Sequence, residues 1–183
     1  LAQILIDSGQ SEAHANCLPA IIREGQRIAG ITRNLLEFSR KREESPEPVD
    51  IPGLIRHSFE LIAHQYQLDG ITLVEEYDKH LPPAFCNPQQ VQQVLLNVFS
   101  NARYALNQRY PTADNNKRIV ISVTGKGREG RRTVHIAITD YGTGIEHHIM
   151  DRLMDPFFST KAKGEGTGLG LSISRQLAEM LGG

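Results

Sequence analysis

The chain has 183 residues, of which 39% are hydrophobic and 22% charged, and its formal net charge at pH 7 is -1. This composition is typical of a globular domain with an appendage, and 20 basic against 21 acidic residues exclude a global positive field for nucleic acid or an anionic membrane. No apolar run approaches the roughly 18 residues that a membrane span requires.

Cys17 and Cys86 lack the spacing of a structural zinc site, and two free thiols suit a reducing compartment. We therefore expect a cytoplasmic location. Because the sequence begins at Leu1 rather than Met and ends just after a helical pattern, we also expect a fragment of a longer protein, and the sequence leaves open whether that protein is membrane-anchored.

The N-terminal part of the chain is predicted to be helical. Ile21, Ile28 and Leu35 recur every seven residues, with basic residues on other faces, which indicates a helix over 18–42 that packs in a bundle or against its own copy. Residues 1–7 are predicted to be the end of a preceding helix. The sequence therefore predicts part of a helical hairpin.

A charged, proline-containing linker over 43–48 predicts the boundary between a domain over 1–44 and a domain over 45–183. Within the second domain the predicted elements are a helix over 51–67 begun by Asp50, a strand over 71–77, a helix over 88–108 capped by Asn87, strands over 119–124 and 133–139, a short helix over 148–154 and a final helix over 169–181.

The helix that follows Pro88 carries a row of side-chain amides. Gln89, Gln93, Asn97 and Asn101 are spaced four residues apart, so they share one face. The apolar residues expected to form the opposite, buried face are Val91, Val94, Leu95, Val98 and Ala102. Amide oxygens are hard ligands that suit Mg²⁺, but a solvated polar face explains the same row, and both interpretations stay open.

Two glycine-containing segments follow. Asp140, Gly142 and Gly144 come directly after an apolar strand, where a carboxylate can accept a hydrogen bond from an exocyclic amine; an ordinary strand-ending turn explains the same pattern. The alternating glycines of 164–170 lead into a helix, so backbone N–H groups and the helix dipole can face a phosphate. This second segment matches neither a P-loop nor a dinucleotide-binding fingerprint.

Between these two segments, residues 155–161 contain the sequence Asp-Pro-Phe-Phe-Ser-Thr-Lys. Lys161 can reach a phosphate as a point charge. Phe157 and Phe158 are consistent with the anchor of a mobile loop and equally with ordinary core residues.

The order of the amide-rich helix, D-x-G-x-G, Pro-Phe-Phe and G-x-G-x-G-L-G-L resembles the N, G1, F and G2 boxes of sensor histidine kinases. These belong to the superfamily shared with DNA gyrase, a heat-shock chaperone ATPase and a mismatch-repair ATPase. The resemblance covers residues 20–183, and 93–97 and 158–161 are similar to the nitrogen-regulation subgroup. It implies an α/β two-layer sandwich, the Bergerat-type ATP-binding fold with a mixed sheet and helices on one face, preceded by part of a helical dimerisation hairpin.

The resemblance also implies roles for single residues. Asn101 would bind Mg²⁺, Asn97 would face the phosphates of ATP, Asp140 would take the adenine amine, and residues 159–167 would form the ATP lid. The full set that the resemblance assigns to ATP is Asn97, Asn101, Tyr104, Asp140, Gly142, Gly144, Ile145, Phe158, Lys161, Gly166, Thr167, Gly168, Leu169 and Gly170. Tyr104 stands where many relatives have a Lys or Arg, which puts a cationic phosphate contact there in doubt.

One position separates the chemistries of the superfamily. Its hydrolases carry a glutamate four residues before the Mg²⁺-binding asparagine, and here that place holds Asn97. Because an amide cannot accept a proton from water at neutral pH, the sequence favours phosphoryl transfer over hydrolysis. The resemblance then implies an ATP-dependent protein-histidine kinase, with an ATPase clamp or a non-catalytic nucleotide-binding or dimerisation module as alternatives.

The acceptor histidine is expected upstream of Leu1. His14 and Pro19 reproduce the H-x-x-x-x-P spacing of the family, but Ala15 replaces the usual acidic neighbour and His14 lies only 24 residues before Phe38, too few for a full hairpin. The resemblance implies a homodimer through the N-terminal helices and a response-regulator receiver domain as partner. We expect no contact of this chain with nucleic acid or membrane, and we expect the closing C-terminal strands of such a domain to lie outside it.

Overall fold

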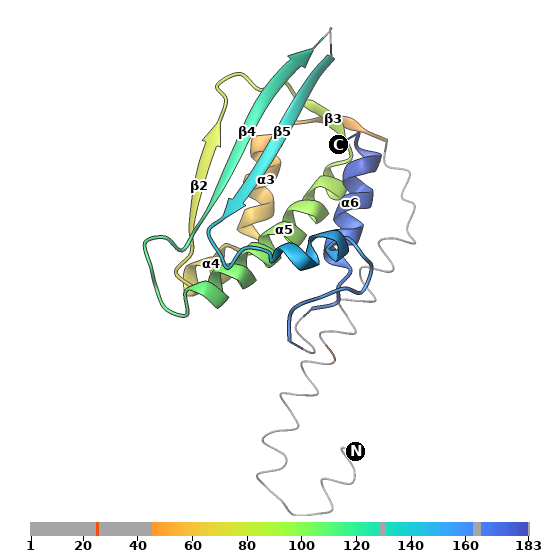
Figure 1. Cartoon of the computed structure of the whole chain (residues 1–183). Helices are drawn as coiled ribbons and strands as arrows, with labels where there is room; N and C mark the ends of the chain where they lie inside the picture. Colours follow the sequence, from red (N-terminus) through yellow and green to blue (C-terminus); the bar gives the residue numbers. More distant parts are fainter. Residues whose placement is uncertain (1–24, 26–44, 129–130, 163–165, 183) are drawn as a thin grey trace, which may run out of the picture. The chain divides into compact units, whose positions relative to one another are not determined.

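The computed structural model describes residue 25 and residues 45–128, 131–162 and 166–182 (Figure 1). The chain divides into two compact units, one of Leu1–Glu43 with Phe157–Gly168 and one of Glu44–Pro156 with Leu169–Gly183. Apart from the helical Gly25, the helices predicted over 1–7 and 18–42 lie outside the described residues. Within the described part of the chain, no helix has both the length and the hydropathy that a bilayer span requires.

The elements of the larger unit follow the predicted order, with two additional strands. They are β1 (Glu47–Val49), α3 (Ile51–Glu60), α4 (Ala63–Leu68), β2 (Thr72–Tyr77), β3 (Ala84–Cys86), α5 (Pro88–Arg109), β4 (Arg118–Arg128), β5 (Arg131–Asp140), the 3-10 helix η1 (His147–Arg152) and α6 (Gly170–Met180).

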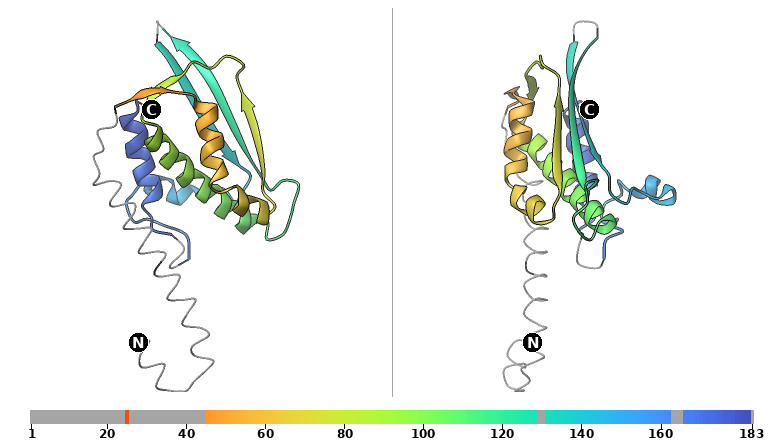
Figure 2. Two further views of the ribbon diagram at one scale, coloured as in Figure 1. Left: turned by 180° about the vertical axis from the view of Figure 1, so that it is seen from behind. Right: turned by 90° about the vertical axis from the view of Figure 1, so that its left-hand side faces the viewer.

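The main sheet has the strand order β2-β4-β5 and is mixed, because β2 runs parallel to β4 whereas β4 and β5 form an antiparallel hairpin. Ile119, Ile121 and Val123 of β4 are fully buried and share one core cluster with residues of α3 and α5, so the helices cover the face to which these side chains point (Figure 2). The α/β two-layer fold expected from the sequence is confirmed.

Helix α5 is the central element of the helical layer. Its N-terminus is where the sequence predicts it, because the Asn87 side chain accepts hydrogen bonds from the N–H groups of Gln89 (3.0 Å) and Gln90 (3.1 Å). Its buried row is Val91, Leu95, Phe99, Ala102 and Leu106. The predicted apolar face was wrong in part, since Val94 and Val98 are only half-buried.

Two local predictions were wrong. The single helix predicted over 51–67 is two helices, because the chain breaks at Leu61 and Ile62; the break carries no glycine or proline that would mark it in the sequence. The predicted linker over 43–48 extends into β1, which pairs antiparallel with β3. Strands of three residues are too short to show an alternating pattern, and Pro48 is tolerated because β1 belongs to a two-stranded sheet with open edges.

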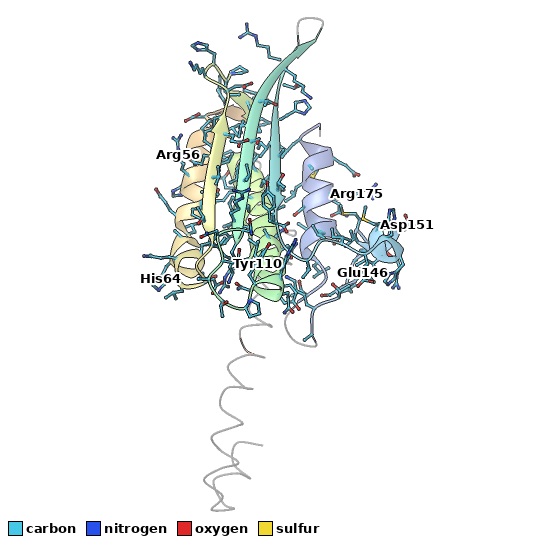
Figure 3. All side chains as sticks on the ribbon, turned by 60° about the vertical axis from the view of Figure 1, so that its left-hand side comes forward. Arg56, His64, Tyr110, Glu146, Asp151 and Arg175 are labelled. Carbon is cyan, nitrogen blue, oxygen red and sulfur yellow. The ribbon has the colours of Figure 1, made fainter. Side chains whose placement is uncertain are left out.

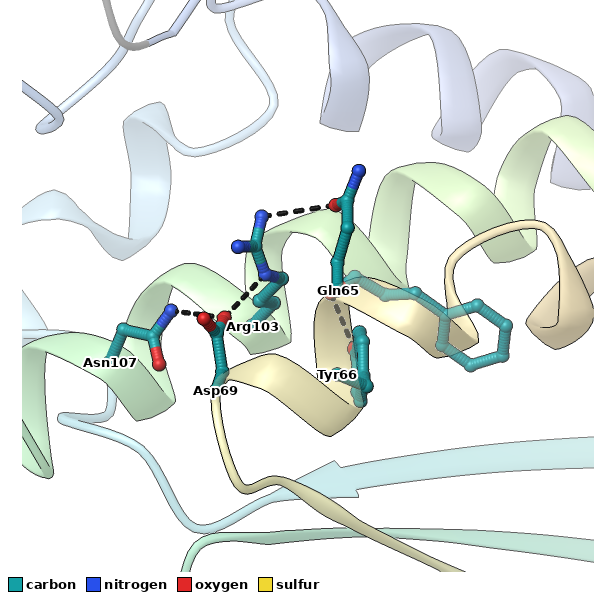
Figure 4. A network of polar contacts seen from close by, with 6 residues as sticks. Gln65, Tyr66, Asp69, Arg103 and Asn107 are labelled. Atoms are coloured by element: carbon teal, nitrogen blue, oxygen red, sulfur yellow. Dashed lines mark hydrogen bonds and ion pairs between the residues drawn. The ribbon is translucent and has the colours of Figure 1, made fainter. Parts of the chain in front are cut away.

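Helix α4 and its C-cap residue Asp69 form side-chain hydrogen bonds with α5, one of them from Arg103 Nη1 to Gln65 Oε1 at 3.0 Å (Figure 4). The buried Tyr66 hydroxyl donates to the carbonyl oxygen of Phe99 at 2.7 Å. The Asp69 carboxylate accepts hydrogen bonds from Arg103 Nε (2.5 Å) and Asn107 Nδ2 (2.6 Å). Phe99 and Arg103 lie on either side of Asn101 in the sequence. Helix α4 and Asp69 therefore fix the part of α5 that carries the side-chain amide of Asn101.

Charge strengthens this connection. Partial burial acts to raise the pKa of the Asp69 carboxyl, but the hydrogen bonds from Arg103 and Asn107 and the positive charges of Arg103 and Lys117 outweigh it. The pKa of Asp69 therefore lies below its ordinary value. A carboxyl whose pKa is lowered by folding stabilises the protein at neutral pH, and this contribution is lost as the pH falls through the folded-state pKa.

We expect Asp69→Asn to lower the free energy of unfolding by about 1–2 kcal/mol at pH 7, because a charge-assisted hydrogen bond is replaced by a neutral one. The difference from wild type should shrink as the pH falls below about 4, where the carboxyl becomes protonated in the unfolded chain and then in the folded chain. Urea unfolding at a series of pH values measures this. A difference that does not change with pH would contradict the assignment.

Candidate functional site

One face of α5 carries Asn97, Asn101 and Ala105 at intervals of four residues. All three are half-buried. Because a helix rises about 1.5 Å per residue, they form three levels about 6 Å apart. The rotation of α5 that buries Leu95 and Phe99 turns this face away from the sheet and leaves it open to the segments that follow in the chain.

At the first level, Asn97 is bonded to the start of α6. Its side-chain Nδ2 donates to the carbonyl oxygen of Gly170 and to the hydroxyl of Ser174, both at 3.2 Å. Ser172 and Ser174 are buried, so small side chains of α6 face the neighbouring helix and allow a close approach. The structure thus brings Asn97 of the amide row together with the end of the glycine-rich segment.

At the third level, the loop after β5 rests on Ala105. Gly142 is buried, and a Cβ atom at this position would lie 2.6 Å from the Cβ of Ala105. The N–H of Thr143 donates to the carbonyl oxygen of Ala105 at 3.3 Å. Only a glycine allows the backbone to come this close to α5. This packing explains why position 142 needs a glycine, whereas a simple strand-ending turn would not require one.

Asp140 is the last residue of β5 and its side chain stabilises the same loop. Its Oδ1 accepts a hydrogen bond from the N–H of Gly142 at 2.9 Å. Side chains at every second position of a strand share one face. Asp140 therefore lies on the same face of β5 as the half-buried Ile136 and Ile138, which is the face toward the helices. Gly144, with a φ of 73°, and the exposed Ile145 complete the turn.

Sequence reasoning missed two arginines that contact this loop. Arg109 Nη1 donates to the carbonyl oxygens of Tyr141 (3.2 Å) and Gly142 (3.0 Å). The Arg118 guanidinium lies over the ring of Tyr141, 4.7 Å from its centroid. No local pattern could have found them, because Arg109 and its partners are more than 30 residues apart in the sequence and the contact depends on the fold.

Asn101 occupies the level between these two attachments. The loop after β5 and the start of α6 therefore meet α5 eight residues apart, which corresponds to about 12 Å along the helix. Tyr104 is half-buried on α5, and Leu169 is the half-buried residue that precedes α6. In the larger unit, the predicted residues of the N box lie on α5, and those of the G1 box and of the end of the G2 box pack against the same helix.

The remaining predicted residues belong to the other unit. Within it, the N–H of Phe157 donates to the carbonyl oxygen of Gly168 at 2.9 Å, so these two residues lie side by side. Gly168 has a φ of 68°, and a Cβ there would overlap the backbone of Phe157. Phe158, Lys161, Gly166 and Thr167 are half-buried, whereas Phe157 is 76% exposed, so the interpretation of Phe157 as a core residue was wrong.

The histidines of the larger unit do not form a site. Those that the structure describes are all exposed: His57, His64, His80, His135, His147 and His148. No group of three His, Cys, Asp or Glu side chains among the described residues could hold a metal ion. His14 lies outside the described residues.

Comparison with known proteins gives a consistent result. Residues 86–183 match the family model described as "Histidine kinase-, DNA gyrase B-, and HSP90-like ATPase". The whole chain aligns at 32% identity with 37% of the sensor histidine kinase ZraS of Escherichia coli K12. It also aligns at 30% identity with 51% of the sensory histidine kinase/phosphatase NtrB of Proteus hauseri. The chain therefore spans between about a third and a half of these relatives.

Two solved structures of histidine kinases are similar to this chain in fold. Full-length ShkA in complex with AMPPNP is similar over 94% of this chain and 35% of its own, at 25% identity and a TM-score of 0.70. The catalytic domain of the histidine kinase ThkA, in a nucleotide-free form, is similar over 74% of this chain and 80% of its own, at 26% identity and a TM-score of 0.55.

The contact between Gly142 and α5 can be tested directly. We expect Gly142→Ala to lower the free energy of unfolding by roughly 1–3 kcal/mol, because the added methyl group would press on Ala105. Gly127→Ala is the matched control, since a Cβ at Gly127 would meet nothing within 4 Å. Urea unfolding of both variants measures the difference, and equal stability of the two would show that the loop does not pack on α5 as described.

Proposed function

Because this chain belongs to the family of histidine kinase-, DNA gyrase B- and HSP90-like ATPases and contains a catalytic domain of the sensor histidine kinase type, we propose that it binds ATP with Mg²⁺ along the Asn97–Ala105 face of α5. We further propose that the whole protein transfers the γ-phosphoryl group to a histidine upstream of this chain, from which it passes to an aspartate of a response regulator. The observation that carries the proposal is the spacing of the two glycine-containing segments on one helix.

The end of the site at Ala105 is suited to the adenine base. Asp140 uses Oδ1 to accept the N–H of Gly142, and a carboxylate has a second oxygen that can accept a hydrogen bond from the exocyclic amine of adenine. The absence of a side chain at Gly142 brings the backbone against α5, which places Asp140 beside the Ala105 end of this face.

The end at Asn97 is suited to the phosphates. Helix α6 begins at Gly170, and its N-cap residue, Leu169, makes no side-chain capping hydrogen bond, unlike Asp50 of α3 and Asn87 of α5. Its first N–H groups and the positive end of its dipole can therefore stabilise an anion. The distance of about 12 Å along α5 between this end and Ala105 is consistent with a nucleotide that lies along the helix, with its base on Gly142 and its phosphates at α6.

Asn101, between these ends, would hold Mg²⁺ through its amide oxygen. Such an oxygen is a suitable ligand for a hard cation that keeps phosphate and water ligands in its other positions. When bound, Mg²⁺ supplies positive charge that offsets the charge of the phosphates during transfer. Hydrogen bonds from Tyr66 to the carbonyl of Phe99 and from Arg103 to Asp69 hold the stretch of α5 that carries this amide.

Asn97 supports a kinase rather than a hydrolase. Its amide is a poor general base, and its Nδ2 already donates to Gly170 and Ser174, so its role in the described conformation is to hold the start of α6. With an amide in place of a general base at position 97, transfer depends on positioning and on an external nucleophile. The proposal includes dimerisation through the N-terminal helices and a receiver domain as the final acceptor.

We expect Asn101→Ala to weaken the Mg²⁺-dependent part of ATP affinity by roughly tenfold or more, because it removes the proposed metal ligand. The fold, checked by circular dichroism, should be unchanged. Gln108→Ala is the matched control, since Gln108 is an exposed amide on the same helix. Calorimetric titrations with ATP, with and without Mg²⁺, measure the effect, and an unchanged affinity of Asn101→Ala would remove Asn101 from the site.

A second expectation separates the kinase from an ATPase clamp. With Mg²⁺ and ATP, this chain alone should release free phosphate at a rate close to that of ATP without protein, because it lacks both a general base at position 97 and the proposed acceptor. A phosphate-release assay measures this. Sustained Mg²⁺-dependent release that follows the concentration of the chain would favour the ATPase instead.

A further inference from the structure

The loop that follows β5 has little burial to fix its conformation. β5 is an edge strand of the three-stranded sheet, and the chain leaves it at Asp140. Of the six residues in 141–146 that lead to η1, all except Gly142 are exposed. A loop of this kind depends on hydrogen bonds rather than on hydrophobic contacts to keep one conformation.

Arg109 supplies such hydrogen bonds from the last turn of α5. A single guanidinium nitrogen, Nη1, donates to the carbonyl oxygens of two consecutive residues, Tyr141 at 3.2 Å and Gly142 at 3.0 Å. These two carbonyls belong to neighbouring peptide groups, so bonding both fixes the orientation of the two groups, 141–142 and 142–143. The Arg109 guanidinium also lies 5.3 Å from the centroid of the Tyr110 ring, which restricts where it can point.

The orientation set by Arg109 is passed on to Asp140. The carbonyl of Tyr141 accepts from Arg109, and the N–H of Gly142, which belongs to the same planar peptide group, donates to Asp140 Oδ1 at 2.9 Å. This peptide group thus connects the end of α5 to the carboxylate. If the loop turned, the N–H of Gly142 would turn with it, and the second carboxylate oxygen would no longer point in the same direction.

We infer that Arg109 is a positioning residue for base recognition: it holds the carbonyls of Tyr141 and Gly142 so that Asp140 presents its carboxylate to the exocyclic amine of adenine. This inference rests on the proposed function. Arg109 touches the loop and not the base, so its substitution should change which base is preferred and leave the phosphate end at Asn97 intact.

The test compares ATP with inosine triphosphate, which has the same phosphates but a carbonyl oxygen in place of the amine. The carboxylate of Asp140 accepts a hydrogen bond from the amine and repels the carbonyl, so wild type should bind ATP more tightly. Arg109→Met should reduce this preference by roughly tenfold, mainly by weakening ATP binding. Arg109→Lys should keep most of the preference, because one ammonium nitrogen can donate to both carbonyls.

Arg56→Met is the matched control. Arg56 lies on α3, away from Tyr110 at the end of α5 and from Glu146 in the loop, as Figure 3 shows. Its guanidinium also lies over a tyrosine ring, that of Tyr77 at 5.6 Å, and pairs with Glu75 at 3.6 Å. Its substitution therefore removes a tyrosine contact and a polar contact of the same kinds, but far from the loop after β5. The preference for ATP should stay at the wild-type value.

The outcomes separate the inference from the proposed function. If wild type prefers ATP and Arg109→Met loses that preference while Arg109→Lys retains it, the inference is supported. If wild type prefers ATP and Arg109→Met keeps the wild-type ratio, or loses affinity for both nucleotides equally, Arg109 does not position Asp140 and the inference is overturned. A wild type that binds neither nucleotide would overturn the proposed function itself.

Discussion

The structure depends on the rotation of α5 about its own axis. Leu95 and Phe99 are buried against the core that includes β4, and this burial fixes which side chains face away from the sheet. Asn97, Asn101 and Ala105 share the remaining face because they are four residues apart. A rotation of α5 that freed Phe99 would also move both amides, so the hydrophobic core and the candidate site cannot vary independently.

The contacts around α5 add to this constraint from different directions. Asp69 and Tyr66 hold it from the side of α4, Asn97 joins it to α6, and Arg109 joins it to the loop after β5. Each of these contacts is polar and joins two residues that are more than 30 positions apart in the sequence. Hydrophobic burial places the helix, and the polar contacts determine how the segments on either side of Asn101 are presented to a ligand.

Sequence reasoning was sufficient where the signal is local. Asn87 followed by Pro88 marks the start of α5, Asp50 marks the start of α3, and alternating residues predict the β4–β5 hairpin. It failed for β1 and β3, which are too short to show a pattern, and for the break after α3, which no sequence signal marks. The site residues Asn97, Asp140 and Gly142 could be proposed from their motifs, whereas Arg109 and Ser174 could not, because their roles arise only from contacts that the fold creates.

The proposed function requires that this chain positions ATP for transfer to a histidine rather than to water. The most direct test uses the protein extended N-terminally through the proposed acceptor helix, incubated with Mg²⁺ and γ-labelled ATP. We expect label on the protein that is stable in alkali and labile in acid, as is characteristic of phosphohistidine. A protein that binds ATP and releases labelled phosphate but never becomes labelled would contradict the proposed function.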